Sequence, residues 1–255
     1  MLLTVDIGNT NVKYGCFDGD KLLFMERVAT DKSRTSVQYA VELRGILDIN
    51  GCAVNDVTGC VIGSVVPEVA NSVASAVRSL TGRDALILGP GVKTGLNIKI
   101  DNPAEAGSDL IASAVGAKAK YRLPCVIIGM GTATTVFSVD RDGNFIGGAI
   151  MPGMKISLNA LVGQTSLLPD IGLRTPGKVI CTNTTDSMLS GLIYGTASMI
   201  DGLCRRFRRE LGEECSFVAT GGLSHLVIPE CEENIVLDED ITVDGLRIIY
   251  EKNRK

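Results

Sequence analysis

Histidine is almost missing from this chain of 255 residues, and none of its eight cysteines belongs to a C-x-x-C pair. Zinc sites are built from such pairs and from histidines, so no zinc framework is expected around the single His225. The cysteines are scattered through apolar segments, which is typical of reduced core residues in a cytoplasmic protein. They are Cys16, Cys52, Cys60, Cys125, Cys181, Cys204, Cys215 and Cys231.

Long apolar runs and concentrated positive charge are also absent. No stretch reaches the roughly eighteen apolar residues of a membrane span, and the N-terminus lacks the basic and apolar regions of a signal peptide. The formal net charge is −4, and the one dense basic group, at residues 205–209, is accompanied by Glu210, Glu213 and Glu214. We therefore expect neither a membrane nor a nucleic acid as the main partner.

The apolar content is high enough for a large buried core, at 45% with a mean hydropathy of +0.24. Three alternating or apolar runs, at residues 2–8, 12–17 and 21–28, are separated by short polar turns and predict an antiparallel meander. Helices and strands are then expected in alternation, at residues 36–50, 60–66, 67–81 and 85–89. This order predicts an α/β fold.

The second half of the chain repeats the pattern of the first. Residues 126–150 again give a strand, a threonine-rich turn, a second strand, an Asp-Gly turn and a third strand. A shift of 123 positions places Gly8 on Gly131, Asn9 on Thr132 and Asn11 on Thr134. Any two antiparallel hairpins look alike, but both of these open their halves, so we favour an internal duplication. The domains expected from it are residues 1–116 and 117–255.

The polar turn after the first strand is suited to binding phosphate. Backbone N–H groups in tight glycine-bearing turns, with threonine and asparagine side chains, form a concavity for phosphate oxygens. Asp6 could hold Mg²⁺ through water, and Lys13 adds a positive charge. The chain contains neither a Walker P-loop nor a Rossmann glycine motif. The turn itself consists of Gly8, Asn9, Thr10 and Asn11.

Two further stretches are candidates for the same site. Gly221, at a predicted strand end, could let a nucleoside approach the backbone closely, although a simple turn before a helix explains it as well. Asp109 precedes an alanine-rich helical pattern and is either an N-terminal cap or a catalytic base for phosphoryl transfer. A later helical pattern, at residues 187–202, has an apolar face that suits a dimer interface or ordinary core.

Motifs along nearly the whole chain resemble those of type III pantothenate kinases, members of the acetate and sugar kinase/Hsc70/actin superfamily. The matching segments are DIGNTNVK at residues 6–13, SVVP at 64–67, DNPAEAGSD at 101–109, GTATT at 131–135, GGAIMPG at 147–153, NTTDSMLSGLIYG at 183–195 and ATGGL at 219–223. Several motifs in one order are more specific than any of them alone.

The resemblance implies two duplicated ribonuclease-H-like (actin-like ATPase) domains with a nucleotide cleft between them, in a homodimer. It also implies ATP-dependent phosphorylation of the primary hydroxyl of pantothenate to 4'-phosphopantothenate, the first step of coenzyme A biosynthesis. The cofactors it implies are ATP, Mg²⁺ and a monovalent cation, K⁺ or NH₄⁺.

The resemblance also implies roles for single residues. The segment from Asp6 to Lys13 matches the first phosphate loop, with Asp6 at the metal, and Gly131 and Thr132 match the second loop. Asp109 matches the general base. The positions that match the pantothenate pocket are Gly107, Ser108, Asp109, Leu110 and Thr184.

Three residues depart from the family pattern. Leu110 stands where the family has an arginine, Gly129 stands where it has an aspartate that binds the monovalent cation, and Ile100 replaces a tyrosine. Losing a buried charge-assisted contact costs roughly 2 to 5 kcal/mol, so two such losses could slow catalysis by orders of magnitude. The alternative to a pantothenate kinase is therefore a catalytically impaired homologue that binds ligands as a regulatory or accessory protein.

Overall fold

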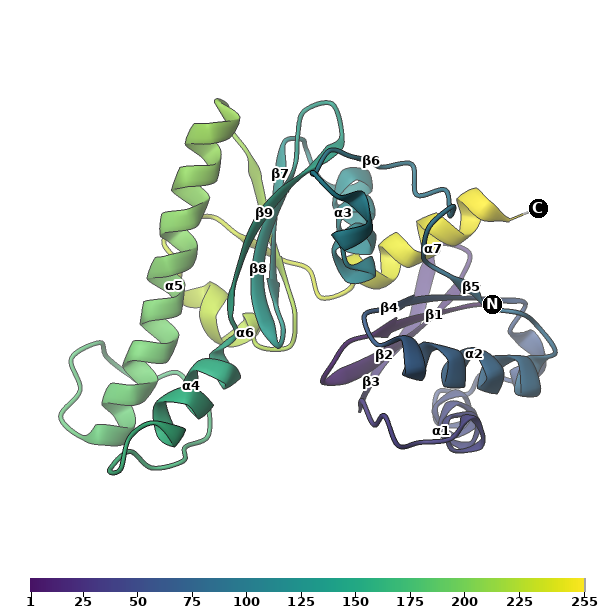
Figure 1. The fold of residues 1–255 in the computed structure, drawn as a ribbon, viewed down its shortest axis with the longest axis horizontal. Coiled ribbons are helices and arrows are strands. Elements are labelled where there is room, and N and C mark those ends of the chain that lie inside the picture. The colour runs from purple at the N-terminus through teal and green to yellow at the C-terminus, as the bar shows by residue number, and fades with distance from the viewer. Residues whose placement is uncertain (255) are drawn as a thin grey trace. The chain divides into compact units, whose positions relative to one another are not determined.

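The computed structural model describes residues 1–254 and divides the chain into two compact units (Figure 1). Unit 1 comprises residues 1–96 and 101–119 and the chain from residue 240 onward, and unit 2 comprises residues 97–100 and 120–239. The end of the chain therefore belongs with its beginning. The domain boundary predicted between residues 116 and 117 refers to the duplicated domains and not to these compact units, so it stays a prediction.

Unit 1 is built on a mixed sheet with the strand order β3-β2-β1-β4-β5. The first three strands are antiparallel neighbours, as the meander pattern predicts, and β4 and β5 continue the sheet in parallel with β1. The strands are β1 (Leu2–Ile7), β2 (Asn11–Asp18), β3 (Lys21–Ala29), β4 (Gly59–Ser64) and β5 (Leu86–Ile87).

Helices cover both faces of this sheet. Side chains of β1 such as Leu3 and Val5 point toward α1 (Ser36–Ile49) and α2 (Pro67–Thr81), whose apolar residues join them in one core. The opposite face carries Val61 and packs against α3 (Ser108–Lys120) and α7 (Ile241–Asn253). Because successive residues of a strand point to opposite faces, each strand can serve both cores. Short 3₁₀ turns complete the unit at Val54–Asp56 and Pro103–Glu105.

Helices α3 and α7 cross at two glycines. A Cβ atom at Gly245 of α7 would clash with the backbone oxygen of Ala112, and one at Gly116 of α3 would clash with the backbone oxygen of Ile241. Beside this contact the hydroxyls of Ser113 and Thr242 are 2.8 Å apart and form a buried hydrogen bond. Missing side chains thus allow α3, the helix that begins at Ser108, to lie directly against α7.

Replacing Gly245 by alanine tests this contact. Alanine normally favours a helix over glycine by about 1 kcal/mol, but the clash at this crossing should reverse the sign and lower the free energy of unfolding by about 1–3 kcal/mol. Urea denaturation measures the change. The matched control is Gly202→Ala in a different helix, where a Cβ meets no atom within 4 Å and stability should rise. Equal effects of the two substitutions would contradict the proposed packing.

Unit 2 repeats the topology of unit 1. Its sheet has the order β11-β10-β7-β8-β9-β6, in which β9-β8-β7-β10-β11 reproduces the order and strand directions of β3-β2-β1-β4-β5. The predicted duplication therefore describes the fold. The strands are β6 (Asn97–Ile98), β7 (Cys125–Met130), β8 (Ala133–Val139), β9 (Asn144–Pro152), β10 (Ser216–Thr220) and β11 (Val236–Leu237).

Helix α5 (Thr184–Leu211) lies along one face of this second sheet (Figure 1). The sequence left open whether the apolar face of residues 187–202 forms a dimer interface or ordinary core. This face belongs to the core of unit 2, because Leu189, Ile193, Ala197 and Ile200 are all buried. A dimer interface at these four residues is therefore wrong. The remaining helices are α4 (Met154–Gly163) and α6 (Ser224–Val227), with a 3₁₀ turn at Ile228–Glu230.

The two hairpins differ by one residue in their turns. The last paired residues are Ile7 with Val12 in the first hairpin and Met130 with Thr134 in the second, so the second turn is one residue shorter. The constant shift used in the sequence comparison is right for Gly8 and Gly131 but wrong beyond the turn, where Thr134 corresponds to Val12. The partner of Asp6 across the hairpin is Lys13, and the partner of Gly129 is Thr135.

All eight cysteines are free, and Cys16, Cys60, Cys125 and Cys204 are buried. Among the described residues no helix combines the length and the apolar character that crossing a bilayer requires.

Candidate functional site

A row of charged residues crosses the sheet of unit 1 near the end of β1. Asp6 on β1 pairs with Lys13 on β2, and Lys13 pairs with Arg27 on β3. On the other side of Asp6 lies Gly63 of β4, which has no side chain. Residues paired in register point to the same face, so the Asp6 carboxylate and the Lys13 ammonium lie side by side.

The turn that follows β1 is held in shape by its own backbone and by Thr30. The Gly8 N–H donates to the oxygen of Asn11 at 2.9 Å, and the Thr30 hydroxyl donates to the Gly8 oxygen at 2.7 Å. Asn9, Thr10 and Asn11 are exposed. The turn predicted to bind phosphate therefore presents its polar groups at the surface of unit 1.

Asp109 lies in the first turn of α3, so it is not the residue that caps the helix. The backbone N–H groups of Leu110 and Asp109 favour the ionised form of its carboxyl and so oppose the rise in its pKa. One of its oxygens would lie 2.5 Å from a Cβ atom at residue 107, so a larger residue there would require the Asp109 side chain to shift. The neighbouring Ser108 hydroxyl is buried and has no hydrogen-bond partner within the described part of the chain.

Burial and nearby charges shift the pKa values of both carboxyls, Asp6 and Asp109. Burial raises the pKa of Asp6 to about 6, an effect that Lys13 opposes and the nearby charge of Asp109 reinforces. Burial also raises the pKa of Asp109, although the N–H groups of Leu110 and Asp109 and the charge of Lys13 oppose it. Lys13 is thus the positive charge next to both carboxylates. Two carboxylates with raised pKa values beside one lysine are typical of a site that binds or moves charge.

These residues fit a magnesium ion and phosphate groups. Mg²⁺ is usually bound by one or two carboxylates with water and phosphate oxygens completing its shell, and Asp6 can supply such a carboxylate. A cluster of three or more histidine, cysteine or acidic side chains, as a structural metal site requires, does not occur among residues 1–254. The unpartnered Ser108 hydroxyl provides a donor for an anionic or hydroxyl-bearing ligand.

Unit 2 carries the second predicted phosphate turn at the end of β7. The Gly131 N–H donates to the oxygen of Ala133 at 3.0 Å, and Thr132 is exposed. Gly221 follows β10 with φ +111°, a conformation that favours glycine, and a Cβ atom there would clash with the Met130 backbone. Gly221 and the turn therefore lie together where strands β7 and β10 end.

The residues around Gly129 do not fit the monovalent cation that the family resemblance implies. Gly129 offers no carboxylate, and a Cβ atom built on it would lie 2.6 Å from the Thr135 hydroxyl oxygen. The other neighbour in register is Thr220 on β10. A carboxylate at residue 129 could enter only if the Thr135 side chain rotated away.

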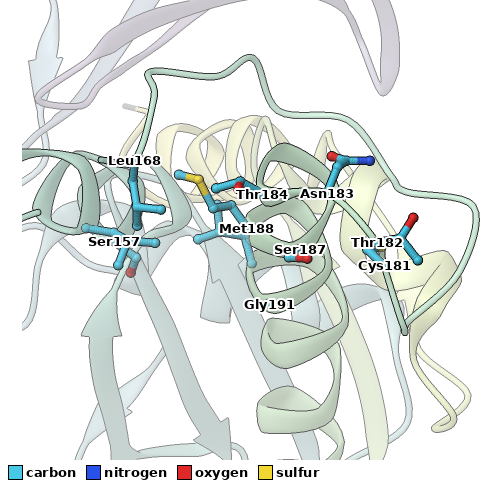
Figure 2. A pocket seen from close by; sticks show the side chains of 11 residues that line it. Ser157, Leu168, Cys181, Thr182, Asn183, Thr184, Ser187, Met188 and Gly191 are labelled. Atoms are coloured by element: carbon cyan, nitrogen blue, oxygen red, sulfur yellow. The ribbon is translucent and has the colours of Figure 1, made fainter. Parts of the chain in front are cut away.

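The remaining predicted residue, Thr184, belongs to unit 2, whereas Asp109 belongs to unit 1. It begins α5 and lines a cavity of about 830 Å³. Figure 2 shows Ser157 and Leu168 on one side of Met188, with Thr182 and Asn183 on the other. The lining mixes hydroxyl and amide groups with aliphatic side chains, which suits a small polar ligand with an apolar portion.

Sequence reasoning missed Arg27 and Thr30. Arg27 lies across from Lys13 only because of the β2–β3 register, and Thr30 acts through its contact with the Gly8 oxygen. Counting outward from the short Asp-Gly turn at residues 18–19 would have placed Glu26 opposite Lys13, because a bulge between Cys16 and Phe17 shifts the register by one residue. No sequence signal marks Thr30.

Two mixed sheets of repeated topology, with glycine-bearing turns after their first strands, form the fold that actin-like ATPases and sugar kinases share. Solved structures agree over nearly their whole lengths. A Campylobacter jejuni protein assigned to the Baf family of transcriptional activators matches with TM-score 0.62 at 16% identity, covering 98% of each chain. Component A of (R)-2-hydroxyglutaryl-CoA dehydratase from Acidaminococcus fermentans matches with TM-score 0.59 at 15% identity, covering 100% of this chain and 99% of that one.

The family follows from the sequence model that matches residues 2–206, which describes type III pantothenate kinase. The chain belongs to the type III pantothenate kinase family. The resemblance read from the sequence motifs is thereby confirmed, and so is the actin-like fold class.

Proposed function

We propose that this chain catalyses ATP-dependent phosphorylation of pantothenate to 4'-phosphopantothenate, which makes it a phosphotransferase with an alcohol acceptor. The observation that carries the proposal is the group of Asp6, Lys13 and Asp109 in unit 1, in which burial raises the pKa of both carboxyls. Family membership supports the substrate.

In the proposed reaction, Asp109 accepts the proton of the primary hydroxyl of pantothenate as its oxygen attacks the terminal phosphorus of ATP. The new phosphorus–oxygen bond forms while the bond to the leaving ADP breaks. A raised pKa brings a carboxylate closer to the value at which it can take a proton near neutral pH. Gly107 leaves room for this carboxylate, and Ser108 provides the hydrogen-bonding hydroxyl next to it.

Asp6 and Lys13 serve the phosphate groups in this proposal. Asp6 would hold Mg²⁺, which when bound neutralises charge on the phosphate oxygens. Lys13 adds a second positive charge and also favours the ionised form of both carboxyls. The phosphate-binding turns are residues 8–11 in unit 1 and Gly131 and Thr132 in unit 2, and Gly221 is the contact proposed for the nucleoside.

We also propose that the protein is a cytoplasmic homodimer whose ligands are small molecules. Thr184 and the cavity beside it are assigned to pantothenate, because the lining combines polar and aliphatic groups. The segment around this cavity exposes large apolar side chains that a second copy could cover. They are Ile150, Ile156, Leu161, Leu167, Val179 and Ile180.

A second candidate function is a catalytically impaired homologue that binds ligands as an accessory or regulatory protein. Leu110, half-buried in the first turn of α3, offers no guanidinium for an anionic substrate, and Gly129 offers no carboxylate. The likeness to a protein assigned to a family of transcriptional activators is compatible with this candidate.

A coupled ATP assay with pantothenate, run with and without ammonium, separates the two candidates. We expect turnover by the wild type and no large gain in turnover when Leu110→Arg is combined with Gly129→Asp. Nucleotide binding without turnover, together with a large gain in the double variant, would favour the impaired homologue. The single variants serve as controls for the effect of each change alone.

A further inference from the structure

Corresponding positions of the two repeated sheets carry different chemistry. In unit 1 the three residues in register near the end of the first strand are Gly63, Asp6 and Lys13. The carboxylate therefore has an ammonium on one side and, on the other, a glycine against which Leu246 packs. The corresponding residue of unit 2 is Gly129, which lacks the carboxylate.

The residues in register with Gly129 differ from those in register with Asp6 of unit 1. Thr135 of β8 takes the place of the lysine, and Thr220 of β10 takes the place of the glycine. Residues paired in register point to the same face of a sheet, so both threonine side chains flank the space over Gly129. Two hydroxyls with a gap between them thus replace a carboxylate with a lysine beside it.

The two hydroxyl oxygens lie where they can contact a ligand in this gap. Thr135 Oγ1 lies 2.6 Å from the point where a Cβ atom of residue 129 would be, so it leans over the glycine. Thr220 is only 6% exposed, and its hydroxyl has no hydrogen-bond partner in the described residues. A buried hydroxyl without a partner is unfavourable unless a ligand or water completes it.

The place in the fold favours an anionic ligand. Thr220 is the last residue of β10, and Gly221 directly after it lies against the backbone of Met130, the residue before the turn at Gly131. The two hydroxyls therefore lie beside the turn already assigned to phosphate. Neutral hydroxyls donate hydrogen bonds to phosphate oxygens.

We propose that the hydroxyls of Thr135 and Thr220 bind a phosphate oxygen of the nucleotide, and that nucleotide binding by this chain needs no monovalent cation. This inference rests on the proposed function insofar as it assumes that unit 2 binds nucleotide. It assigns to two threonines the task that a cation and its carboxylate ligand would otherwise perform.

The affinity for MgADP, measured by isothermal titration calorimetry, tests the proposal. The dissociation constant of the wild type should change by less than about twofold when KCl is replaced by NH₄Cl or LiCl at constant ionic strength. Thr220→Val and Thr135→Val should each weaken binding roughly tenfold, because a hydrogen bond to a charged acceptor is lost. The control Thr134→Val removes a buried hydroxyl from the opposite face of β8 and should leave affinity unchanged.

Wild-type affinity that rises specifically with K⁺ or NH₄⁺, or Thr220→Val and Thr135→Val variants that bind like the wild type, would overturn the inference. This test is independent of the proposed kinase activity, because it measures affinity for MgADP and not turnover of pantothenate. Turnover with unchanged affinity in both valine variants refutes only the threonine assignment. Weakened binding without any pantothenate turnover supports the threonines and refutes the kinase.

A ligand-free measurement checks the geometry. Gly129→Ala should lower the Tm by about 2–4 °C because its Cβ atom meets the Thr135 hydroxyl, and adding Thr135→Ala should recover most of the loss. Gly172→Ala in an exposed loop of unit 2, where a Cβ meets no atom within 4 Å, is the control. Additive effects of Gly129→Ala and Thr135→Ala would show that the hydroxyl does not occupy this space.

Discussion

Replacing Asp109 by asparagine is expected to lower the turnover of pantothenate by about 10²- to 10⁴-fold while leaving MgADP affinity nearly unchanged. Asparagine keeps the shape of the side chain, but it cannot take a proton from the attacking hydroxyl. The loss should therefore fall on kcat rather than on folding or nucleotide binding.

The matched control for this substitution is Asp101→Asn, an exposed carboxylate in the same segment. Its turnover should remain within roughly threefold of the wild type. Single-turnover kinetics and thermal melting should be measured on both variants. Full activity of Asp109→Asn would remove this residue as the base, and an equal loss in Asp101→Asn would indicate a general effect of charge in the segment.

Replacing Asp6 by asparagine is expected to have two opposite effects: it stabilises the ligand-free protein at neutral pH and abolishes Mg²⁺-dependent nucleotide binding. Burial raises the pKa of Asp6 to about 6, whereas an aspartate in an unfolded chain titrates near 4. Between these pH values the folded state holds more protons than the unfolded state, so stability falls as the pH rises. Above pH 6 the ionised carboxylate costs up to about 3 kcal/mol, and asparagine removes that cost.

Urea denaturation of the ligand-free protein at several pH values measures the first effect. The difference in free energy of unfolding between Asp6→Asn and the wild type should be small near pH 4 and should grow to its full value above pH 6. Asp18→Asn, at an exposed carboxylate at the end of β2, is the control for the loss of one negative charge. A pH-independent difference for Asp6→Asn would mean that the Asp6 carboxyl is not the group that titrates.

The second effect is measured by titrating ADP with and without Mg²⁺. The wild type should bind more tightly with Mg²⁺, and Asp6→Asn should bind equally under both conditions. Protonation of Asp6 below pH 6 should mimic the substitution, so the benefit of Mg²⁺ should fade as the pH drops through 6. A benefit of Mg²⁺ that survives in Asp6→Asn would assign the ion to another residue.

Local patterns in the sequence predict much of this fold because each pattern has a short-range physical cause. Pro67 at the first turn of α2 and Gly82 in the left-handed conformation after its end mark the limits of that helix. The alternation of apolar Leu3, Val5 and Ile7 with polar Thr4 and Asp6 follows from the opposite orientation of successive side chains in a strand. Repetition of these local signals was enough to reveal the duplication.

Long-range register could not be read in the same way. A constant shift placed Asn11 on Thr134 because counting along the sequence does not detect that the second turn is one residue shorter. That single residue decides whether Lys13 corresponds to Val136 or to Thr135, and only strand pairing identifies Thr135. The partner on the other side, Thr220, is more than eighty residues away from Thr135 in the sequence, so no local signal links the two.

The return of α7 to unit 1 has a consequence for biosynthesis. Unit 2 is nearly continuous in the chain, whereas the core beneath α3 needs Leu246 and Ile249 from the last helix. As the chain leaves the ribosome, residues 120–239 can therefore fold before α7 is synthesised. Until then one face of the sheet of unit 1 stays uncovered. The helix that carries Asp109 gains its glycine-to-glycine contact only when Gly245 has been synthesised, so the centre proposed for catalysis matures after unit 2.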